Sequence, residues 1–178
     1  MPRSWLTGLA VCAAASALLL AVRVGSAPSA GRAHASAVGA AAKSCPLTFP
    51  DRRKPPASAA GTLPPVPPVF HGNGKLWVKL WPFGVIVARP GVISRDGSID
   101  IKLPWWRGVP GRLTVTGRRL DAPAAPVKAY IPSGYGSSGF QPSGVVFPTQ
   151  GCWKVAGRVG KVRLDFVTLV VTAAGNGY

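Results

Sequence analysis

From Lys75 onward, apolar and polar residues alternate in short runs that glycine and proline interrupt at regular intervals. This period of two predicts β-strands, and no window longer than about ten residues has the period of a helix. About a hundred residues in about seven or eight strands predict a single immunoglobulin-like β-sandwich, an all-β fold, over residues 71–178. The predicted strands are Lys75–Trp81, Gly84–Ala88, Ser98–Leu103, Arg112–Thr116, Val127–Ile131, Gly144–Phe147, Cys152–Arg158 and Val162–Val171.

The run from Ile99 to Leu103 alternates strictly. We expect Ile99, Ile101 and Leu103 to face the core, and Asp100 and Lys102 to face water. Glycine-containing turns separate the strands. Asp96 and Gly97 form one tight-turn pair, and the sequence around Gly160 predicts a hairpin between the last two strands.

The N-terminus has a different pattern, with one basic residue, Arg3, followed by an uncharged apolar run from Trp5 to Val22. Such a run directs a protein out of the cytoplasm. At ~1.5 Å per residue the run is nearly long enough to cross a bilayer as a helix. Residues 1–27 are therefore predicted to be a signal peptide or, if they are not removed, an N-terminal membrane anchor. Either outcome places the protein outside the cytoplasm, as a secreted or cell-surface protein.

Residues 28–70 are rich in alanine, serine, glycine and proline, a composition that cannot bury enough apolar surface to fold alone. We expect a linker here, interrupted by Cys45. Cys152 is the other cysteine outside the leader, and an even pair in an exported chain predicts a disulfide. Cys152 and Trp153 point to opposite faces of a strand, so either the disulfide or Trp153 faces the core. Because Cys45 comes from an extended segment outside the sheet pattern, we expect the disulfide on the outer face and Trp153 in the core.

The tract from Leu103 to Gly111 contains adjacent tryptophans, Trp105 and Trp106, followed by Arg107. On an extended chain the two indoles face opposite ways, so we expect one in the core and the other near the surface beside Arg107. An exposed indole beside a cation can stack on a sugar ring or take part in a protein contact. The alternative is that both tryptophans cover the end of the sandwich. The glycine-serine loop from Tyr135 to Phe140 is the second predicted contact element.

The domain is strongly basic, with fourteen Lys or Arg against four Asp from Lys75 to Tyr178, a net charge of +10. A surface this basic attracts polyanions. For an exported protein we expect a cell-wall glycan, an anionic envelope polymer or an extracytoplasmic protein as partner, rather than nucleic acid. A membrane contact is expected only through an uncleaved leader.

Residues suited to catalysis are scarce. The chain has five aspartates and no glutamate, and His71 is the one histidine close to the predicted domain. The sequence from Gly134 to Gly139 spells G-x-G-x-x-G, but the residues after it cannot start the helix that a dinucleotide site requires. No Cys or His residues have the spacing of a zinc site. We therefore expect a non-catalytic protein without a metal or cofactor.

Several longer motifs distinguish this chain: Gly72-Asn73-Gly74-Lys75-Leu76-Trp77, Asp96-Gly97-Ser98, Pro104-Trp105-Trp106-Arg107-Gly108, Gly117-Arg118-Arg119-Leu120-Asp121, Gly134-Tyr135-Gly136, Ser138-Gly139-Phe140-Gln141 and Gly151-Cys152-Trp153. Over about Cys45 to Val171 the sequence resembles a family of exported bacterial β-sandwich proteins that has no assigned activity. The resemblance implies export and a β fold, and it supplies no catalytic residues. Many leaders in that family resemble lipoprotein signals, and this leader departs from that pattern.

Overall fold

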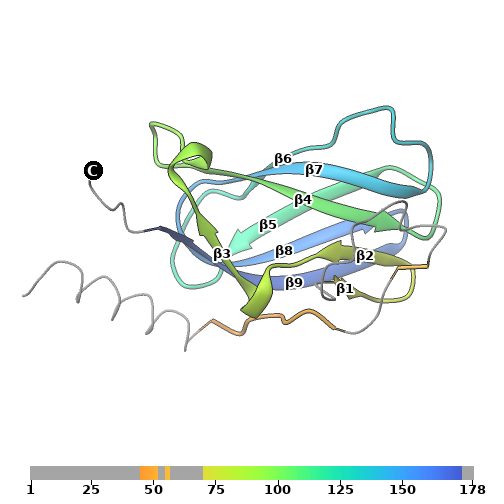
Figure 1. Ribbon diagram of the computed structural model, residues 1–178, viewed down its shortest axis with the longest axis horizontal. Helices are drawn as coiled ribbons and strands as arrows, with labels where there is room; N and C mark the ends of the chain where they lie inside the picture. The colour runs from red at the N-terminus through yellow and green to blue at the C-terminus, as the bar shows by residue number, and fades with distance from the viewer. Residues whose placement is uncertain (1–44, 52–54, 57–69, 174–178) are drawn as a thin grey trace, which may run out of the picture.

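The computed structural model describes residues 45–51, 55–56 and 70–173, and this part of the chain is all-β (Figure 1). Two short 3-10 helices, η1 (Pro82–Gly84) and η2 (Pro90–Val92), interrupt the strands. The strands are β1 (Phe70–Gly72), β2 (Leu76–Lys79), β3 (Val85–Ala88), β4 (Ile99–Arg107), β5 (Leu113–Arg119), β6 (Lys128–Tyr130), β7 (Gly139–Phe147), β8 (Gly151–Val159) and β9 (Val162–Thr172).

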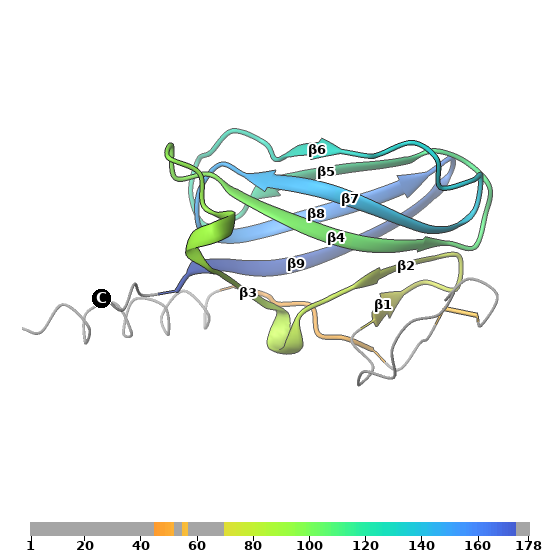
Figure 2. The ribbon, with the colours of Figure 1, turned by 45° about the horizontal axis from the view of Figure 1, so that its top comes forward.

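These strands form two sheets, one of order β1-β2-β4-β7-β6 and one of order β3-β9-β8-β5. All neighbouring strands are antiparallel except β3 and β9, which run parallel. The order β2-β4-β7-β6 matches A-B-E-D of an immunoglobulin domain, and β5-β8-β9 matches C-F-G. In Figures 1 and 2 the long strands β4, β7, β8 and β9 run along a common axis. The predicted all-β fold is confirmed, and the order of the strands is the one expected for an immunoglobulin-like sandwich.

The core lies between the two sheets, because one cluster of buried apolar side chains draws on strands of both. The rings of Trp105 on β4 and Phe166 on β9 have their centroids 6.1 Å apart. Phe147 on β7 and Trp153 on β8 meet edge to face at 5.5 Å. The predicted alternation from Ile99 to Leu103 is confirmed, since Asp100 and Lys102 are exposed between buried neighbours.

The disulfide between Cys45 and Cys152 lies outside this core, in a smaller cluster with Leu169 and Val171. Trp153 points inward, so the predicted outer-face disulfide is confirmed. Residues 45–51, assigned from the sequence to a linker, lie against the outer face of the second sheet and pair with it. Thr48 exchanges two hydrogen bonds with the backbone of Val167, one through its amide and one through its hydroxyl.

β3 pairs only with the last part of β9, from Leu169 to Thr172, so the same edge of β9 is unpaired before Leu169. Three residues from the N-terminal side of the domain form hydrogen bonds with this unpaired edge. The backbone amide of Thr48 donates to the carbonyl of Val167, and Asn73 Nδ2 donates to that of Arg163. His71 Nε2 lies 3.2 Å from the carbonyl of Asp165. Alternate carbonyls of the strand are thus satisfied, which protects an edge that would otherwise pair with another chain.

All eight predicted strands are present, and the structure adds three features that the pattern missed. β1 is a ninth strand, only three residues long. β4 continues through Pro104 to Arg107, and β7 begins at Gly139 rather than at Gly144. The predicted hairpin is confirmed, with Val159 opposite Val162 and Gly160 at a φ of 55°. Residues 1–27 and most of 28–70 lie outside the described residues. Within the described part of the chain, no helix has the length and apolar character needed to cross a membrane.

Candidate aromatic binding surface

Trp105 and Trp106 follow one another on β4 and point to opposite faces of the first sheet. Both are fully buried, Trp105 in the core and Trp106 on the outer face. The expectation that one indole would lie near the surface is therefore wrong. Trp106 is buried because Phe70 meets it edge to face, with ring centroids 4.9 Å apart, and Phe140 covers it from β7 at 5.6 Å.

The ring contacts continue outward to solvent. Phe140 meets Tyr135 with ring centroids 5.8 Å apart, and their residues are 39% and 41% exposed. Thus the structure brings together Trp106, Tyr135 and Phe140, three of the five residues that the sequence singled out, while Trp105 stays on the other side of the sheet. Phe140 thus packs on the buried Trp106 ring, and Tyr135 packs on Phe140.

Arg107 is buried, and its guanidinium holds the glycine-rich loop in place. Nη1 donates to the carbonyl of Gly111 at 2.7 Å, and Nη2 donates to three loop carbonyls, those of Tyr135 (2.8 Å), Gly136 (3.0 Å) and Ser138 (3.4 Å). Burial lowers the pKa of this guanidinium from its ordinary value. Arg107 was predicted to contact a ligand, whereas its terminal nitrogens are occupied by the protein's own backbone.

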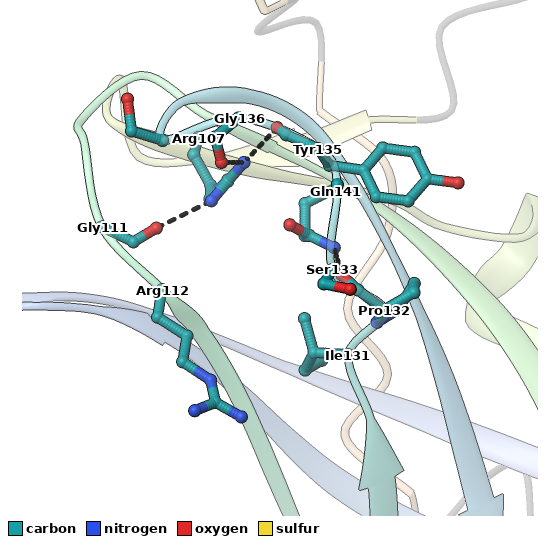
Figure 3. Close-up of a pocket in the computed structure, with 11 residues that line it drawn as sticks. Arg107, Gly111, Arg112, Ile131, Pro132, Ser133, Tyr135, Gly136 and Gln141 are labelled. Atoms are coloured by element: carbon teal, nitrogen blue, oxygen red, sulfur yellow. Dashed lines mark hydrogen bonds between the residues drawn. The ribbon is translucent and has the colours of Figure 1, made fainter.

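A cavity of about 550 Å³ lies beside this loop, between the β4–β5 and β6–β7 connections (Figure 3). Its polar lining includes Arg107, Arg112, Gln141 and the hydroxyl-bearing residues Ser133 and Ser137. Gln141 Nε2 donates to the carbonyl of Pro132, which fixes the amide at the cavity wall. Figure 3 shows the Tyr135 ring turned away from the cavity, so the loop presents an aromatic face on one side and a polar hollow on the other.

Tyr130 on β6 extends the aromatic surface, and the sequence analysis did not single it out. It is 72% exposed and lies in register with Gly144 of β7, which is itself in register with Lys102 of β4. Along β7, Gly144 follows Phe140 by four residues, or roughly 14 Å of extended strand. Pro104 and Pro142 lie opposite each other in the row of residues between Phe140 and Gly144. We call Tyr130, Tyr135 and Phe140 the aromatic surface.

The side chains that the sequence offered for catalysis lie apart from this surface. His71 Nδ1 is 3.3 Å from a carboxylate oxygen of Asp51, and its other ring nitrogen faces the carbonyl of Asp165. The lining of the cavity, as far as the described residues form it, includes no carboxylate, imidazole or thiol. In the same part of the chain, no three His, Cys, Asp or Glu side chains gather as a metal site would require.

Comparisons with family models, with curated proteins and with solved structures gave no match.

Proposed function

We propose that the protein is an exported, non-catalytic binding protein of the cell envelope that holds a glycan on its aromatic surface. The observation that carries the proposal is the set of ring contacts from buried Trp106 through Phe140 to Tyr135. A pyranose ring has a face made of C–H groups, which packs against an aromatic ring while its hydroxyls stay in water. Fixed rings lose little conformational entropy on binding, so more of the contact energy appears as affinity.

The shape of the surface also favours a polymer over a small molecule. Phe140 and Tyr130 flank a row whose side chains are small, and the row lies on the rigid pair β4 and β7. A strip about 14 Å long accommodates two or three sugar units in a line. Lys102 and Tyr130 lie in the next row, on either side of Gly144, and supply hydrogen-bond donors at one end of the strip.

Export is supported by the disulfide, because such bonds persist in oxidising compartments and are rare in the cytosol. It agrees with the apolar leader and with the family resemblance of the sequence. The described residues that line the cavity include no acidic or imidazole side chain, and this composition favours binding over catalysis.

The test is a pull-down of the purified full-length protein, with its disulfide formed, on insoluble cell wall at low and high salt. We expect binding that survives high salt and that falls at least about tenfold in a Tyr135→Ala, Phe140→Ala double variant. Phe83→Ala is the matched control, because Phe83 is also an exposed aromatic residue, 76% exposed, but lies on η1.

Equal losses in the double variant and the control would refute the aromatic surface as the binding site. If high salt abolishes binding equally in the wild type and in the aromatic variants, the interaction is electrostatic and does not depend on the aromatic surface. Recovery of one stoichiometric protein instead of glycan would favour the alternative function, an interaction or inhibitor module that uses the glycine-rich loop.

A further inference from the structure

The outer face of the second sheet has a regular arrangement of charges that the aromatic surface does not use. Strands β5, β8 and β9 place nine side chains in three rows of three, as the register shows. The first row is Thr114, Arg158 and Arg163, the middle row is Thr116, Ala156 and Asp165, and the third is Arg118, Lys154 and Val167. Four cations thus surround the small Ala156, and we call them the cationic face.

Two pairs of like charges lie directly opposite each other in this grid: Arg118 faces Lys154, and Arg158 faces Arg163. Neighbouring strands are only about 5 Å apart, and like charges in this position destabilise a sheet. Two such pairs on one face lower the free energy of unfolding of the domain. A bound anion between the members of each pair would remove that repulsion.

Asp165 is the one acid in the grid, and it offsets only part of the charge. It pairs with Lys154 at 3.4 Å and with Arg163 at 2.8 Å. The side chain of Arg118 makes no hydrogen bond or ion pair with the described part of the chain. The side-chain hydrogen bonds of Arg158 and Arg163 use Nε, which leaves their terminal nitrogens available.

The two halves of this outer face differ in whether another segment of the chain covers them. The apolar half, around Cys152 and Leu169, is covered by the segment that starts at Cys45. Residues 45–51 do not extend over the charged half, which forms a shallow depression of about 230 Å³, lined in part by Arg118, Lys154 and Arg163. Within the described part of the chain, the apolar half of this face is thus covered and the cations are in contact with solvent.

The chemistry of the grid favours phosphate over carboxylate. The two oxygens of a carboxylate are satisfied by one guanidinium fork. A tetrahedral phosphate group can accept from two neighbouring cations at once, and the hydroxyl of Thr116 lies on the adjoining strand as a further donor. The two cation pairs are roughly 14 Å apart along β8, which requires a ligand with repeated charges.

We infer that the cationic face binds a linear polymer with repeated phosphate groups, at a site separate from the aromatic surface. One phosphate lies between Arg118 and Lys154, and another lies between Arg158 and Arg163. Asp165 competes with the polymer for Lys154 and Arg163 and so limits the affinity.

The experiment titrates the full-length protein with inorganic polyphosphate and measures the dissociation constant at several salt concentrations. Arg118→Glu and Arg163→Glu should each weaken binding about tenfold and reduce its salt dependence, since each removes a charge contact. Asp165→Asn should tighten binding about threefold. Arg95→Glu is the matched control: it makes the same change of charge at an exposed turn outside the grid and should change the affinity less than about twofold.

A loss with Arg95→Glu as large as with Arg118→Glu would overturn the inference, because net charge alone would then explain binding. Equal affinity for polygalacturonate, with the same sensitivity to the variants, would overturn the assignment to phosphate. Arg118→Gln, which leaves every hydrogen bond of the sheet in place, provides a second variant should charge reversal impair folding. Unchanged cell-wall binding by the Arg118 variants would show that the two surfaces act separately.

Discussion

The indole of Trp105 lies directly over Gly157 on the facing sheet, in space that a side chain at Gly157 would occupy. Its N–H donates to the hydroxyl of Ser143 at 3.1 Å, and that hydroxyl donates to the carbonyl of Leu103 at 3.2 Å. The position of Trp105, one of two tryptophans in the core, is thus fixed on one side by the absence of a side chain at Gly157 and on the other by its hydrogen bond to Ser143. Burial of the indole N–H costs little because its hydrogen bond is made.

Gly157→Ala should destabilise the domain by about 1–3 kcal/mol, since the new methyl group overlaps the Trp105 ring and the core cannot expand freely. Gly144→Ala is the control. A Cβ there would meet only Asp100, at an ordinary 3.7 Å, so this variant should be neutral or slightly stabilising. Urea denaturation measures both, and equal midpoints for the two variants would contradict the packing argument.

Arg107→Lys should lower the free energy of unfolding by about 1–3 kcal/mol although it keeps the charge. A lysine ammonium cannot reach the carbonyl of Gly111 and those of the loop from Tyr135 to Ser138 together. Hydrogen exchange of the loop amides should accelerate in the same variant. A loop as protected as in the wild type would show that Arg107 does not order it.

Features of the fold that depend on residues close together in the sequence were predicted correctly, whereas several features that depend on distant segments were not. The period-two alternation from Ile99 to Leu103 and the turn at Gly160 are local signals, and both predictions were correct. The pattern ended the strand at Leu103 because Pro104 lacks an N–H. In the structure Pro104 lies opposite Pro142, so the two residues without donors affect at most one position of the ladder.

The candidate site was harder to predict because segments distant in the sequence bury Trp106 and hold Arg107. Nothing near Trp106 in the chain shows that Phe70 and Phe140 will cover it. Nor could the sequence reveal that Nη2 of Arg107 donates to carbonyls about thirty residues away. Tyr130 was overlooked within a predicted strand. A large aromatic residue between Ala129 and Ile131 in a predicted strand was the available signal.

Replacing both Cys45 and Cys152 by alanine should reduce stability by at most about 4–5 kcal/mol, because the disulfide joins residues 107 apart in the sequence. Thermal unfolding of the double variant should show a lower midpoint, with the β-sheet signal retained at low temperature. The amide of Val167 should lose protection, since Thr48 would no longer be held against it. An unchanged midpoint would mean that packing alone holds residues 45–51.

Asp121 should contribute to the pH dependence of stability. The hydrogen bond from Arg119, at 2.7 Å, lowers the pKa of Asp121 below its usual 3.8. The folded protein therefore binds this proton less readily than the unfolded chain. The stabilisation is complete above the unfolded pKa and is lost as the pH falls through the folded one.

Asp121→Asn should consequently cost about 0.5 kcal/mol at pH 6 and almost nothing near pH 2, as measured by urea midpoints over that range. A difference between the two proteins that grows toward low pH would have the wrong sign and would contradict this assignment.

The cross-link between Cys45 and β8 also decides how the domain responds to mechanical load. A pull on the chain ahead of Cys45 passes through the disulfide into β8, which is hydrogen-bonded along its length to both β5 and β9. The force therefore enters at an interior strand of the sheet and bypasses the short strands β1 and β2, which would otherwise peel away first. A domain pulled by the chain ahead of Cys45 can in this way bear tension while β1 and β2 stay unloaded.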